Sequence, residues 1–380
     1  MKPFLFAALL TGLIVVPPAD SGAGVGPSVS QTKPTSLKSV PAPDLEARFA
    51  FSDGWLGADG IYSVGLPDGR TVWLFSDTWI GVVKNGRRQA EGMVNNSIGI
   101  TRGSGPARFY YRRLAGHPRP LFAPSDGHGW FWLWAGVFDG GRLYLFATRV
   151  ESAPGPGAFG FRHFGTALGE IENWQDEPTA WRARWTDVPG SWAPRVFWGS
   201  AALACEGQIY LYGFIDNGGK GLDFRRDMLV ARAPSGRLSD FAAWRFFDGS
   251  AWQADIRRAA PACPDISTEY SVTPIPGRGL FLLINPDVFL SPTIVARTAV
   301  HPWGPWSAKV EVYTCPEADP KRGIFCYAAK HQPVFSDEKD LVISYASNAG
   351  DLATVAHDPS LYVPRFIRAP LGLILPRDVR

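Results

Sequence analysis

Acidic and amide side chains stand at the ends of three consecutive predicted strands early in the chain. The strands are the apolar runs over residues 61–66, 70–75 and 97–101. The polar residues are Asp59 before the first run, Asp77 after the second, and Asn95 and Asn96 before the third. β-Branched and aromatic runs separated by turn residues predict an antiparallel meander. In such a meander these points lie at one end, so the unit presents two carboxylates and two amides on one edge.

A glutamate occupies the corresponding place in a later repeat. Glu269 directly precedes an apolar run over residues 270–275. If both runs line one channel, Asp59 and Glu269 lie nearly opposite each other across it. Paired carboxyl groups suit glycoside hydrolysis, in which one acid protonates the leaving oxygen and the other activates water or attacks the anomeric carbon. We predict Glu269 as the acid and Asp59 as the base or nucleophile, while Asp77 tunes the first acid or holds the sugar.

Polar and aromatic residues at other strand ends are candidates for binding a sugar. Amides bond hydroxyl groups, indole rings stack on sugar faces, and a lysine–histidine pair binds hydroxyls or a charged group. The candidates are Asn95, Asn96, Trp79, Trp134, Trp198, Asp216, Tyr270, Asn285, Lys330, His331 and Asn348. Each also has a structural interpretation, because Asp and Asn cap turns and most of the 15 tryptophans are expected to pack the core.

Five segments of one pattern recur along the chain and set the expected fold. They are residues 69–78, 141–149, 207–216, 279–287 and 340–348. An apolar or small-residue run precedes each segment and another follows it; in the last repeat these are residues 329–335 and 352–356. Five repeats of about four strands are what a five-bladed propeller requires. We predict an all-β, five-bladed β-propeller with antiparallel four-stranded blades.

The composition agrees with a folded β protein. Glycine (41) and proline (33) are frequent, only 19% of residues are charged, and no long stretch has helical periodicity. The net charge of +3 comes with dispersed basic residues, so no nucleic acid partner is expected. We expect a monomer that binds a polysaccharide or oligosaccharide and needs no cofactor.

The N-terminus has the pattern of a secretory signal. Lys2 precedes an apolar run over residues 4–16, which is too short to span a bilayer, and prolines and small residues follow. The next stretch is rich in Ser, Pro, Thr and Gly, as in disordered spacers. We predict a signal peptide over residues 1–23, a spacer over residues 24–45 and one propeller domain over residues 46–380. The protein is expected to be secreted or periplasmic, with no membrane span.

Four cysteines in an exported chain suggest disulfides. Cys315 and Cys326 bracket a short loop and are predicted to pair, which leaves Cys205 and Cys263 as a second pair between neighbouring repeats. The other pairings stay open. A zinc or redox site is not indicated, because the sequence has no C-x-x-C pair, and calcium is disfavoured because it has no D-x-D-x-D-G loop. We expect no metal.

Several segments resemble a known family. They are GADGIYSVGLPDGRTVWLFSDTWIG (57–81) with NNSI (95–98), STEYSV (267–272), YAAKHQPVF (327–335) and LVISYASN (341–348). Together they resemble exported bacterial five-bladed propellers labelled as a domain of unknown function, over roughly residues 51–366. Some members of that family are endo-D-arabinanases, so the resemblance implies a D-arabinan-like furanose polysaccharide as substrate.

A more distant similarity is to the arabinanase, β-xylosidase and invertase propellers. Those proteins use an Asp on the first blade, an Asp on the third and a Glu on the fourth. Asp59 and Glu269 match two of the three, but Trp198 and Gly199 stand where the third-blade Asp is expected. Either Asp77 or Asp216 takes that role, or the mechanism differs, or the protein is not an enzyme of that type.

Two functions therefore stay open, a glycoside hydrolase and a non-catalytic carbohydrate-binding propeller. The acid pair discriminates between them, because a hydrolase needs both carboxyl groups at one mouth of the channel. A sialidase-like propeller is disfavoured, because repeated S-x-D-x-G-x-x-W turns and an arginine cluster are missing from the sequence.

Overall fold

Five antiparallel sheets follow one another along the chain in the computed structural model, which describes residues 37–155, 159–190, 195–218 and 225–375. Blade 1 consists of β3 (Tyr62–Gly65), β4 (Arg70–Phe75), β7 (Ser97–Arg102) and β8 (Arg108–Tyr110). Blade 2 consists of β11 (Trp130–Asp139), β12 (Arg142–Ser152), β13 (Phe161–Ile171) and β14 (Ala183–Asp187). Blade 3 consists of β15 (Val196–Cys205), β16 (Gln208–Asp216), β17 (Arg226–Pro234), β18 (Arg245–Phe247) and β19 (Trp252–Gln253). Blade 4 consists of β20 (Ser271–Ile275), β21 (Leu280–Pro286), β22 (Thr293–Ala299) and β23 (Val310–Thr314). Blade 5 consists of β24 (Ile324–His331), β25 (Asp340–Ala349), β26 (Arg365–Pro370) and β1 (Val40–Pro41).

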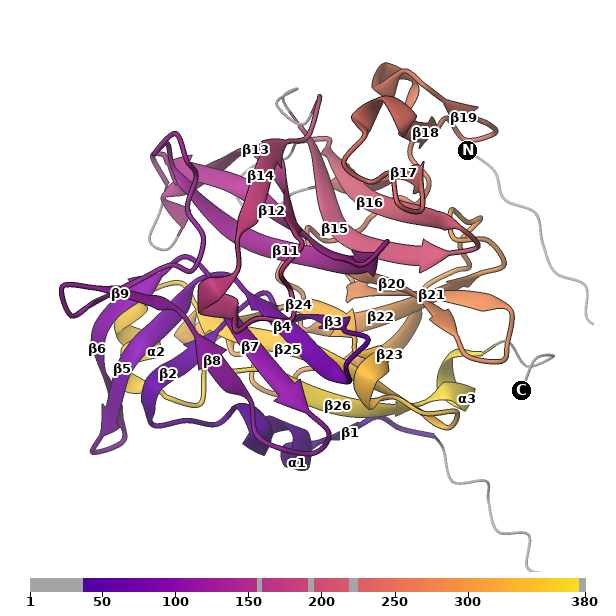
Figure 1. Cartoon of the computed structure of the whole chain (residues 1–380). Coiled ribbons are helices and arrows are strands. Elements are labelled where there is room, and N and C mark those ends of the chain that lie inside the picture. The colour runs from indigo at the N-terminus through magenta and orange to yellow at the C-terminus, as the bar shows by residue number, and fades with distance from the viewer. Residues whose placement is uncertain (1–36, 156–158, 191–194, 219–224, 376–380) are drawn as a thin grey trace, which may run out of the picture. The chain divides into compact units, whose positions relative to one another are not determined.

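The first strands of the blades contact one another in sequence order and close a ring (Figure 1). β3 contacts β11, β11 contacts β15, β15 contacts β20, and β20 contacts β24. The hydroxyl of Ser63 on β3 donates a hydrogen bond of 2.6 Å to Gln332, just after β24, and so joins the last blade to the first. A cavity of about 200 Å³ lies between these strands, lined by residues of all five blades. The predicted five-bladed propeller is confirmed.

The N-terminal strand completes the last blade. Val40 pairs with Arg368 and Pro41 with Ile367, so β1 is the outermost strand of blade 5 (Figure 1). The short helices α1 (Pro43–Glu46) and η1 (Ala47–Phe49) follow it. The folded unit therefore begins before residue 46, and the predicted spacer over residues 24–45 extends too far. The predicted signal peptide and the rest of the spacer lie outside the described residues.

Blade 1 carries an additional sheet that the sequence did not reveal. β2 (Asp53–Ala58), β5 (Thr78–Lys84) and β6 (Arg87–Val94) pair in the order β2-β5-β6. Residues 78–94, to which the sequence analysis assigns no strand, therefore form a β-hairpin. A second small hairpin pairs β9 (Arg112–Leu114) with β10 (His117–Arg119). We call β2, β5 and β6 the side sheet.

The last repeat departs from the prediction in two places. Residues 352–356, expected to be its third strand, lie in helix α2 (Leu352–His357), because Asp351 caps that helix by accepting from the backbone N–H of Thr354 at 2.8 Å. The third strand is β26. The first strand, expected over residues 329–335, is β24, and residues 333–335 form a 3₁₀ turn.

The remaining helices are short. They are η3 (Pro178–Ala180), η4 (Phe241–Ala243), η5 (Ile256–Arg258), η6 (Pro320–Arg322), η7 (Pro333–Phe335) and α3 (Leu371–Ile374). In the part of the chain that the structure describes, no helix is long and apolar enough to cross a membrane.

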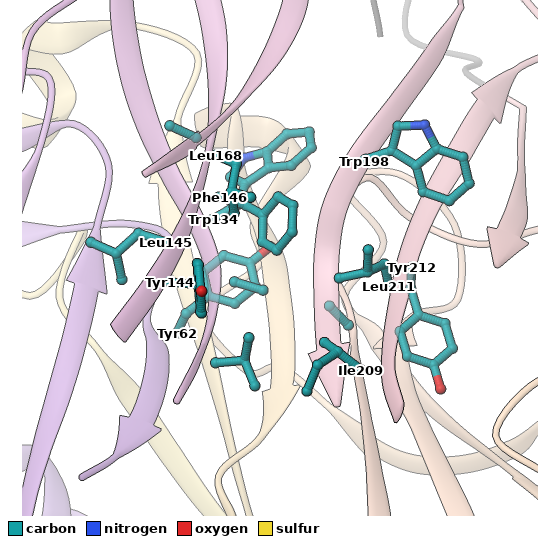
Figure 2. Close-up of a cluster of buried hydrophobic side chains, with 14 of the residues drawn as sticks. Tyr62, Trp134, Tyr144, Leu145, Phe146, Leu168, Trp198, Ile209, Leu211 and Tyr212 are labelled. Carbon is teal, nitrogen blue, oxygen red and sulfur yellow. The ribbon is translucent and has the colours of Figure 1, made fainter. Parts of the chain in front are cut away.

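Aromatic and aliphatic side chains fill the space between blades, as between blades 2 and 3 (Figure 2). Trp134 on β11 and Trp198 on β15 belong to this core and are 2% and 0% exposed. The two blades approach closely at Gly199, where an added Cβ would lie 2.4 Å from the Cβ of Phe146 and where φ is +93°. Only glycine fits that position without strain.

The four cysteines are free thiols in the structure, so the predicted disulfides are not formed. Cys205 pairs with Gln208, which in turn pairs with Pro234 at the end of β17. Cys263 instead forms a β-bridge with Met228, near the start of β17. These two positions on β17 are about 20 Å apart at the rise of a strand, too far for a bond between them. Cys315 and Cys326 are neighbours in a buried cluster, and a hydrogen bond from one thiol to the other raises the pKa of Cys315.

Candidate functional site

Asp59 and Asp77 lie opposite each other where the side sheet joins blade 1. The pairing of Ala58 with Thr78 in the side sheet and of Tyr62 with Leu74 in blade 1 has one continuous register, which places Asp59 opposite Asp77. The N–H of Asp59 donates to the carbonyl of Asp77 at 3.4 Å. Residues directly opposite on paired strands have Cβ atoms about 5 Å apart. The hairpin therefore brings two carboxyl groups together.

Three residues near this pair of aspartates have a left-handed backbone conformation. Gly60 and Ile61 have φ of +86° and +55°, and Ala328, in an irregular stretch of β24, has φ of +61°. Positive φ is rare for a β-branched residue, and such strain concentrates at functional sites. The turned backbone presents the carbonyls of Gly60 and Ala328 to the Lys330 ammonium, which donates to them at 2.6 and 2.9 Å.

Two tyrosines from blade 5 face Asp59. The Tyr327 hydroxyl donates to Oδ2 of Asp59 at 2.8 Å, and the Asn348 amide donates to that hydroxyl at 3.4 Å. The Tyr362 hydroxyl lies close enough to lower the pKa of Asp59 by hydrogen bonding. Tyr362 also has left-handed backbone, with φ of +58°. The loop between β25 and β26 therefore supplies a side chain to the site.

Asp77 accepts hydrogen bonds from two side chains. The indole N–H of Trp132 on β11 donates to Oδ1 of Asp77 at 2.7 Å, and the amide of Asn95 donates to the same oxygen at 3.1 Å. Asn95 was predicted at this edge, and the structure brings it to Asp77. Blade 2 thus contributes Trp132 to a site whose acids come from blade 1.

Glu269 enters from blade 4 and forms an ion pair with Lys330. The two groups are 3.0 Å apart, and the Lys330 and Glu269 side chains are 2% and 16% exposed. The Lys330 ammonium also lies 4.1 Å from the centre of the Tyr62 ring, an arrangement that favours a cation–π interaction. Burial raises the pKa of Tyr62 well above its ordinary value, and the nearby carboxylate of Glu269 raises it further.

The two aspartates hold their protons more strongly than ordinary carboxyl groups do. Burial raises the pKa of Asp59 well above its ordinary range, and the neighbouring charges of Asp77 and Glu269 raise it further. Burial also raises the pKa of Asp77, to about 6, while hydrogen bonds from Trp132 and Asn95 oppose that rise. Both aspartates therefore hold a proton more strongly than an exposed aspartic acid does.

Several predicted binding residues lie within the core rather than at the acids. The Asn96 amide bonds the backbone of Phe122 and Phe131, and the Tyr270 hydroxyl donates to the carbonyl of Gly213 at 2.7 Å. The others in this group are fully or almost fully buried: Trp79, Trp134, Trp198 and Asn285. Their contacts are those of structural residues.

Two further candidates lie in separate surroundings. His331 is buried in the channel between the hydroxyls of Thr273 and Ser336, at 2.7 and 2.9 Å, and burial lowers its pKa to about 3. Asp216 ends β16, accepts from the N–H of Gly218 at 2.8 Å and lies 3.9 Å from the Arg226 guanidinium. In the described part of the chain, neither side chain is hydrogen-bonded to Asp59, Asp77 or Glu269.

The structure adds Trp132, Tyr327, Tyr362 and Tyr62 to the site. Trp132 belongs to the run Trp130-Phe131-Trp132-Leu133-Trp134. The alternating tryptophans are typical of a strand, but they do not indicate which ring lies at the mouth of the channel. Tyr327 stands three residues before Lys330, in the segment over residues 327–335 that the sequence analysis names. The alternation of side chains between the two faces of a strand was the only sequence feature that could have indicated its direction. Tyr362 lies in a long connection without a motif, and the sequence carried no signal for it.

Arg88 of β6 holds the connection that carries Tyr362. Its guanidinium donates to the carbonyls of Val355, Asp358, Leu56, Pro359 and Leu361, at distances of 2.5 to 3.4 Å. The side chain is buried, and burial lowers its pKa to about 10. Arg88 is thus held by five backbone carbonyls rather than by a carboxylate. These hydrogen bonds connect the side sheet to the residues directly before Tyr362.

The acids do not form a recognisable metal centre. Among the described residues, no group of three or more His, Cys, Asp or Glu side chains is arranged to hold a metal ion. What the arrangement can do chemically is donate a proton from one carboxyl group and accept one at another, within a wall of tyrosine and tryptophan side chains.

Comparison with known proteins identifies a family but no activity. The family model DUF5005, described as a domain of unknown function, matches residues 44–370. No curated protein matches the chain. The description of the family states no reaction, so the arabinanase part of the resemblance noted in the sequence stays a proposal.

One solved structure shares the fold at low sequence identity, and others match more weakly. A protein from Bacteroides ovatus ATCC 8483, described as a candidate hydrolase, is 18% identical with a TM-score of 0.71, over 88% of this chain and 92% of that chain. The GH43_1 enzyme from Xanthomonas citri complexed with xylose is 15% identical with a TM-score of 0.44, over 88% and 93%. CoXyl43, a β-xylosidase/α-arabinofuranosidase from a compost metagenome, is 12% identical with a TM-score of 0.43, over 87% and 95%.

Proposed function

This chain belongs to the DUF5005 family of unknown function, and we propose that it is a glycoside hydrolase whose reaction is carried out by Asp59, Asp77 and Glu269. The observation that carries the proposal is the meeting of these three carboxyl groups at one mouth of the channel. Glu269 raises the pKa of Asp59 through its charge, so the two groups face the same end of the propeller. A binding module has no need for two adjacent aspartates whose pKa values are both raised, with a third carboxyl group beside them.

The electrostatics favour a different division of labour from the one predicted from the sequence. Asp59 has the most strongly raised pKa, so it is the group that keeps a proton to give to the leaving oxygen. Glu269 forms an ion pair with Lys330, so we assign it to binding rather than to proton transfer. We assign Asp59 as the general acid and Asp77, with a pKa of about 6, as the base or nucleophile. Glu269 and Lys330 then hold the sugar, and the negative charge of Glu269 favours the protonated form of Asp59.

The substrate we propose is a furanose-containing polysaccharide of the D-arabinan type, with the protein exported to meet it. This part of the proposal is supported by the resemblance of the segments around Asp59, Glu269 and Lys330 to propellers that include endo-D-arabinanases. The apolar faces of Trp132, Tyr327 and Tyr362 beside the acids agree with a sugar ligand, since aromatic side chains commonly line such sites.

The alternative is a non-catalytic carbohydrate-binding propeller. It is supported by the partial burial of the acids and by the use of Trp79, Trp134 and Trp198 in the core rather than as a stacking surface. The two functions differ in what the carboxyl groups do: in a binding module they accept hydrogen bonds from hydroxyls, and their proton has no role.

The test is product release from D-arabinan, L-arabinan, xylan and levan by the wild type, Asp59→Asn, Asp77→Asn and Glu269→Gln. The exposed Asp53→Asn, six residues before Asp59, is the matched control. The proposal expects one polymer to be cleaved by the wild type and by the control, with at least a 10³-fold loss in the Asp59 and Asp77 variants, which still bind that polymer. Retention of a polymer on an affinity gel without cleavage by the wild type supports the binding module instead.

A further inference from the structure

A series of five aromatic rings connects blade 2 to blade 5 above the acids of blade 1. The ring centres of neighbours are 4.6 Å apart for Trp132 and Phe161, 6.5 Å for Phe161 and Phe159, 6.1 Å for Phe159 and Phe325, and 5.7 Å for Phe325 and Tyr327. All five side chains are half-buried. We call these residues the aromatic arch. Its middle contact, Phe159 with Phe325, joins the connection between β12 and β13 to the start of β24.

Both ends of the arch are hydrogen-bonded to the catalytic pair. Trp132 donates to Asp77 at 2.7 Å, and Tyr327 donates to Asp59 at 2.8 Å. Phe161 and Phe159 follow from Trp132, and Phe325 lies two residues before Tyr327 on the same strand. The arch therefore starts at one acid, crosses from blade 2 to blade 5, and ends at the other acid.

The side sheet closes the space behind the acids. Leu56 and Trp79 of this sheet pack in one buried cluster with Ile324 and Tyr362 of blade 5. Since Asp59 directly follows β2 and Asp77 directly precedes β5, the wall begins at the acids themselves. Among the described residues, the aromatic arch on one side and the side sheet on the other restrict the path of a polysaccharide across blade 1.

Resting on the proposed function, we infer that the protein attacks the end of a sugar chain and releases small products, rather than cutting within the chain. An internal bond can reach the acids only if sugar residues continue on both sides of it. In this arrangement the substrate approaches from the side of Glu269, so that one terminal sugar lies under the aromatic arch and the rest of the chain leads away from it. Phe159 and Phe325 are then specificity-determining residues, although they touch neither acid.

The experiment compares products from a cleaved polymer over time, using the polymer of the panel above that the wild type degrades. Mass spectrometry gives the ratio of monosaccharide to longer oligosaccharides, and viscometry reports internal cuts. The variants are Phe159→Ala, Phe325→Ala and the double variant. The control is Phe51→Ala, at an exposed phenylalanine that packs against Phe109. Melting temperatures show that each variant is folded.

The inference expects the wild type and the Phe51 variant to release monosaccharide while the viscosity changes little. The double variant is expected to produce at least 10-fold more oligosaccharide relative to monosaccharide, with an early fall in viscosity. A ladder of oligosaccharides from the wild type at the earliest times overturns the inference and leaves the hydrolase proposal standing. If neither the polymers nor aryl furanosides and xylosides are cleaved, the hydrolase proposal fails and this inference fails with it.

Discussion

Asp59 lies directly opposite Asp77 on two strands of one hairpin, and the pKa of each carboxyl group is raised. Like charges at such a position destabilise a sheet, because the side chains cannot separate and are removed from water. Two hydrogen bonds to each group moderate the effect without removing it. The pair is therefore a place where the fold is less stable than it could be, as is common at functional sites.

Replacing either acid by its amide should stabilise the protein and abolish its activity. In Asp77→Asn the cost of burying a charge is removed while the shape is kept, so we expect the unfolding free energy at pH 7.5 to rise by about 1–3 kcal/mol. Thermal unfolding of Asp59→Asn, Asp77→Asn and the control Asp53→Asn measures this. Lower melting temperatures for both site variants would mean that the carboxylates hold the structure together instead.

The stability conferred by Asp77 should depend on pH with a definite sign. Its pKa is about 6 in the folded protein against an ordinary 3.8, so the folded state binds more protons between these values. Stability is then lost as the pH rises from about 4 to about 6, by about 3 kcal/mol in all for this buried group. We expect the melting temperature of Asp77→Asn minus that of the wild type to increase across this window and then to level off above it. A difference that is constant with pH would contradict the raised pKa.

Lys330→Met should be strongly destabilising. It leaves the carboxylate of Glu269 buried without its partner, and breaking a buried pair costs about 3–5 kcal/mol. The double variant Lys330→Met with Glu269→Leu should recover part of that loss, because no charge is left unpaired. Lys309→Met is the matched control: Lys309 pairs with Asp287 at 2.6 Å in a more exposed setting, where such pairs contribute at most about 1 kcal/mol. Equal effects at the two lysines would refute the importance of burial.

Arg88→Met should affect catalysis through Tyr362. With the five carbonyl contacts removed, the loop before Tyr362 is released, and we expect a lower melting temperature and about a 10-fold lower kcat with KM less affected. Since the Tyr362 hydroxyl lowers the pKa of Asp59, its loss should also move the alkaline limb of the pH–rate profile upward. Arg87→Met, at the exposed neighbouring position, is the control. An unchanged pH profile in Arg88→Met, with only the stability lowered, would restrict Arg88 to a structural role.

Much of the fold could be predicted because the propeller repeats a local pattern. The second strand of every blade lies within or beside its predicted segment, from Arg70–Phe75 to Asp340–Ala349. The side sheet was missed because residues 78–96 are polar enough to look like a loop, although cross-strand pairing with β2 holds them as a hairpin. Helix α2 was mistaken for a strand because a short apolar run is compatible with the repeat of a helix and with that of a strand. The capping side chain of Asp351 favours the helix.

The acids of the site could be predicted and most of their partners could not. Asp59, Asp77, Glu269, Asn95 and Lys330 stand next to turns or strand ends, and propeller topology brings those points together. The tryptophans predicted to bind sugar lie in the core instead. The alternation of side chains along a strand does not distinguish a ring that faces the mouth, such as Trp132, from one that faces the next blade, such as Trp134. Tyr362 and Arg88 depend on contacts between segments more than 250 residues apart in sequence, as from Arg88 to Leu361.

The pairing of β1 with β26 has a consequence for how the protein comes to be folded. Val40 and Pro41 find their partners only near Ile367 and Arg368, so the ring stays open until almost the entire chain has been made. Contacts between distant parts of a chain slow folding, and an unsealed blade exposes strand edges to other molecules in the meantime. A protein truncated after blade 4, or one that lacks residues 37–46, is thus expected to aggregate rather than to form a smaller propeller.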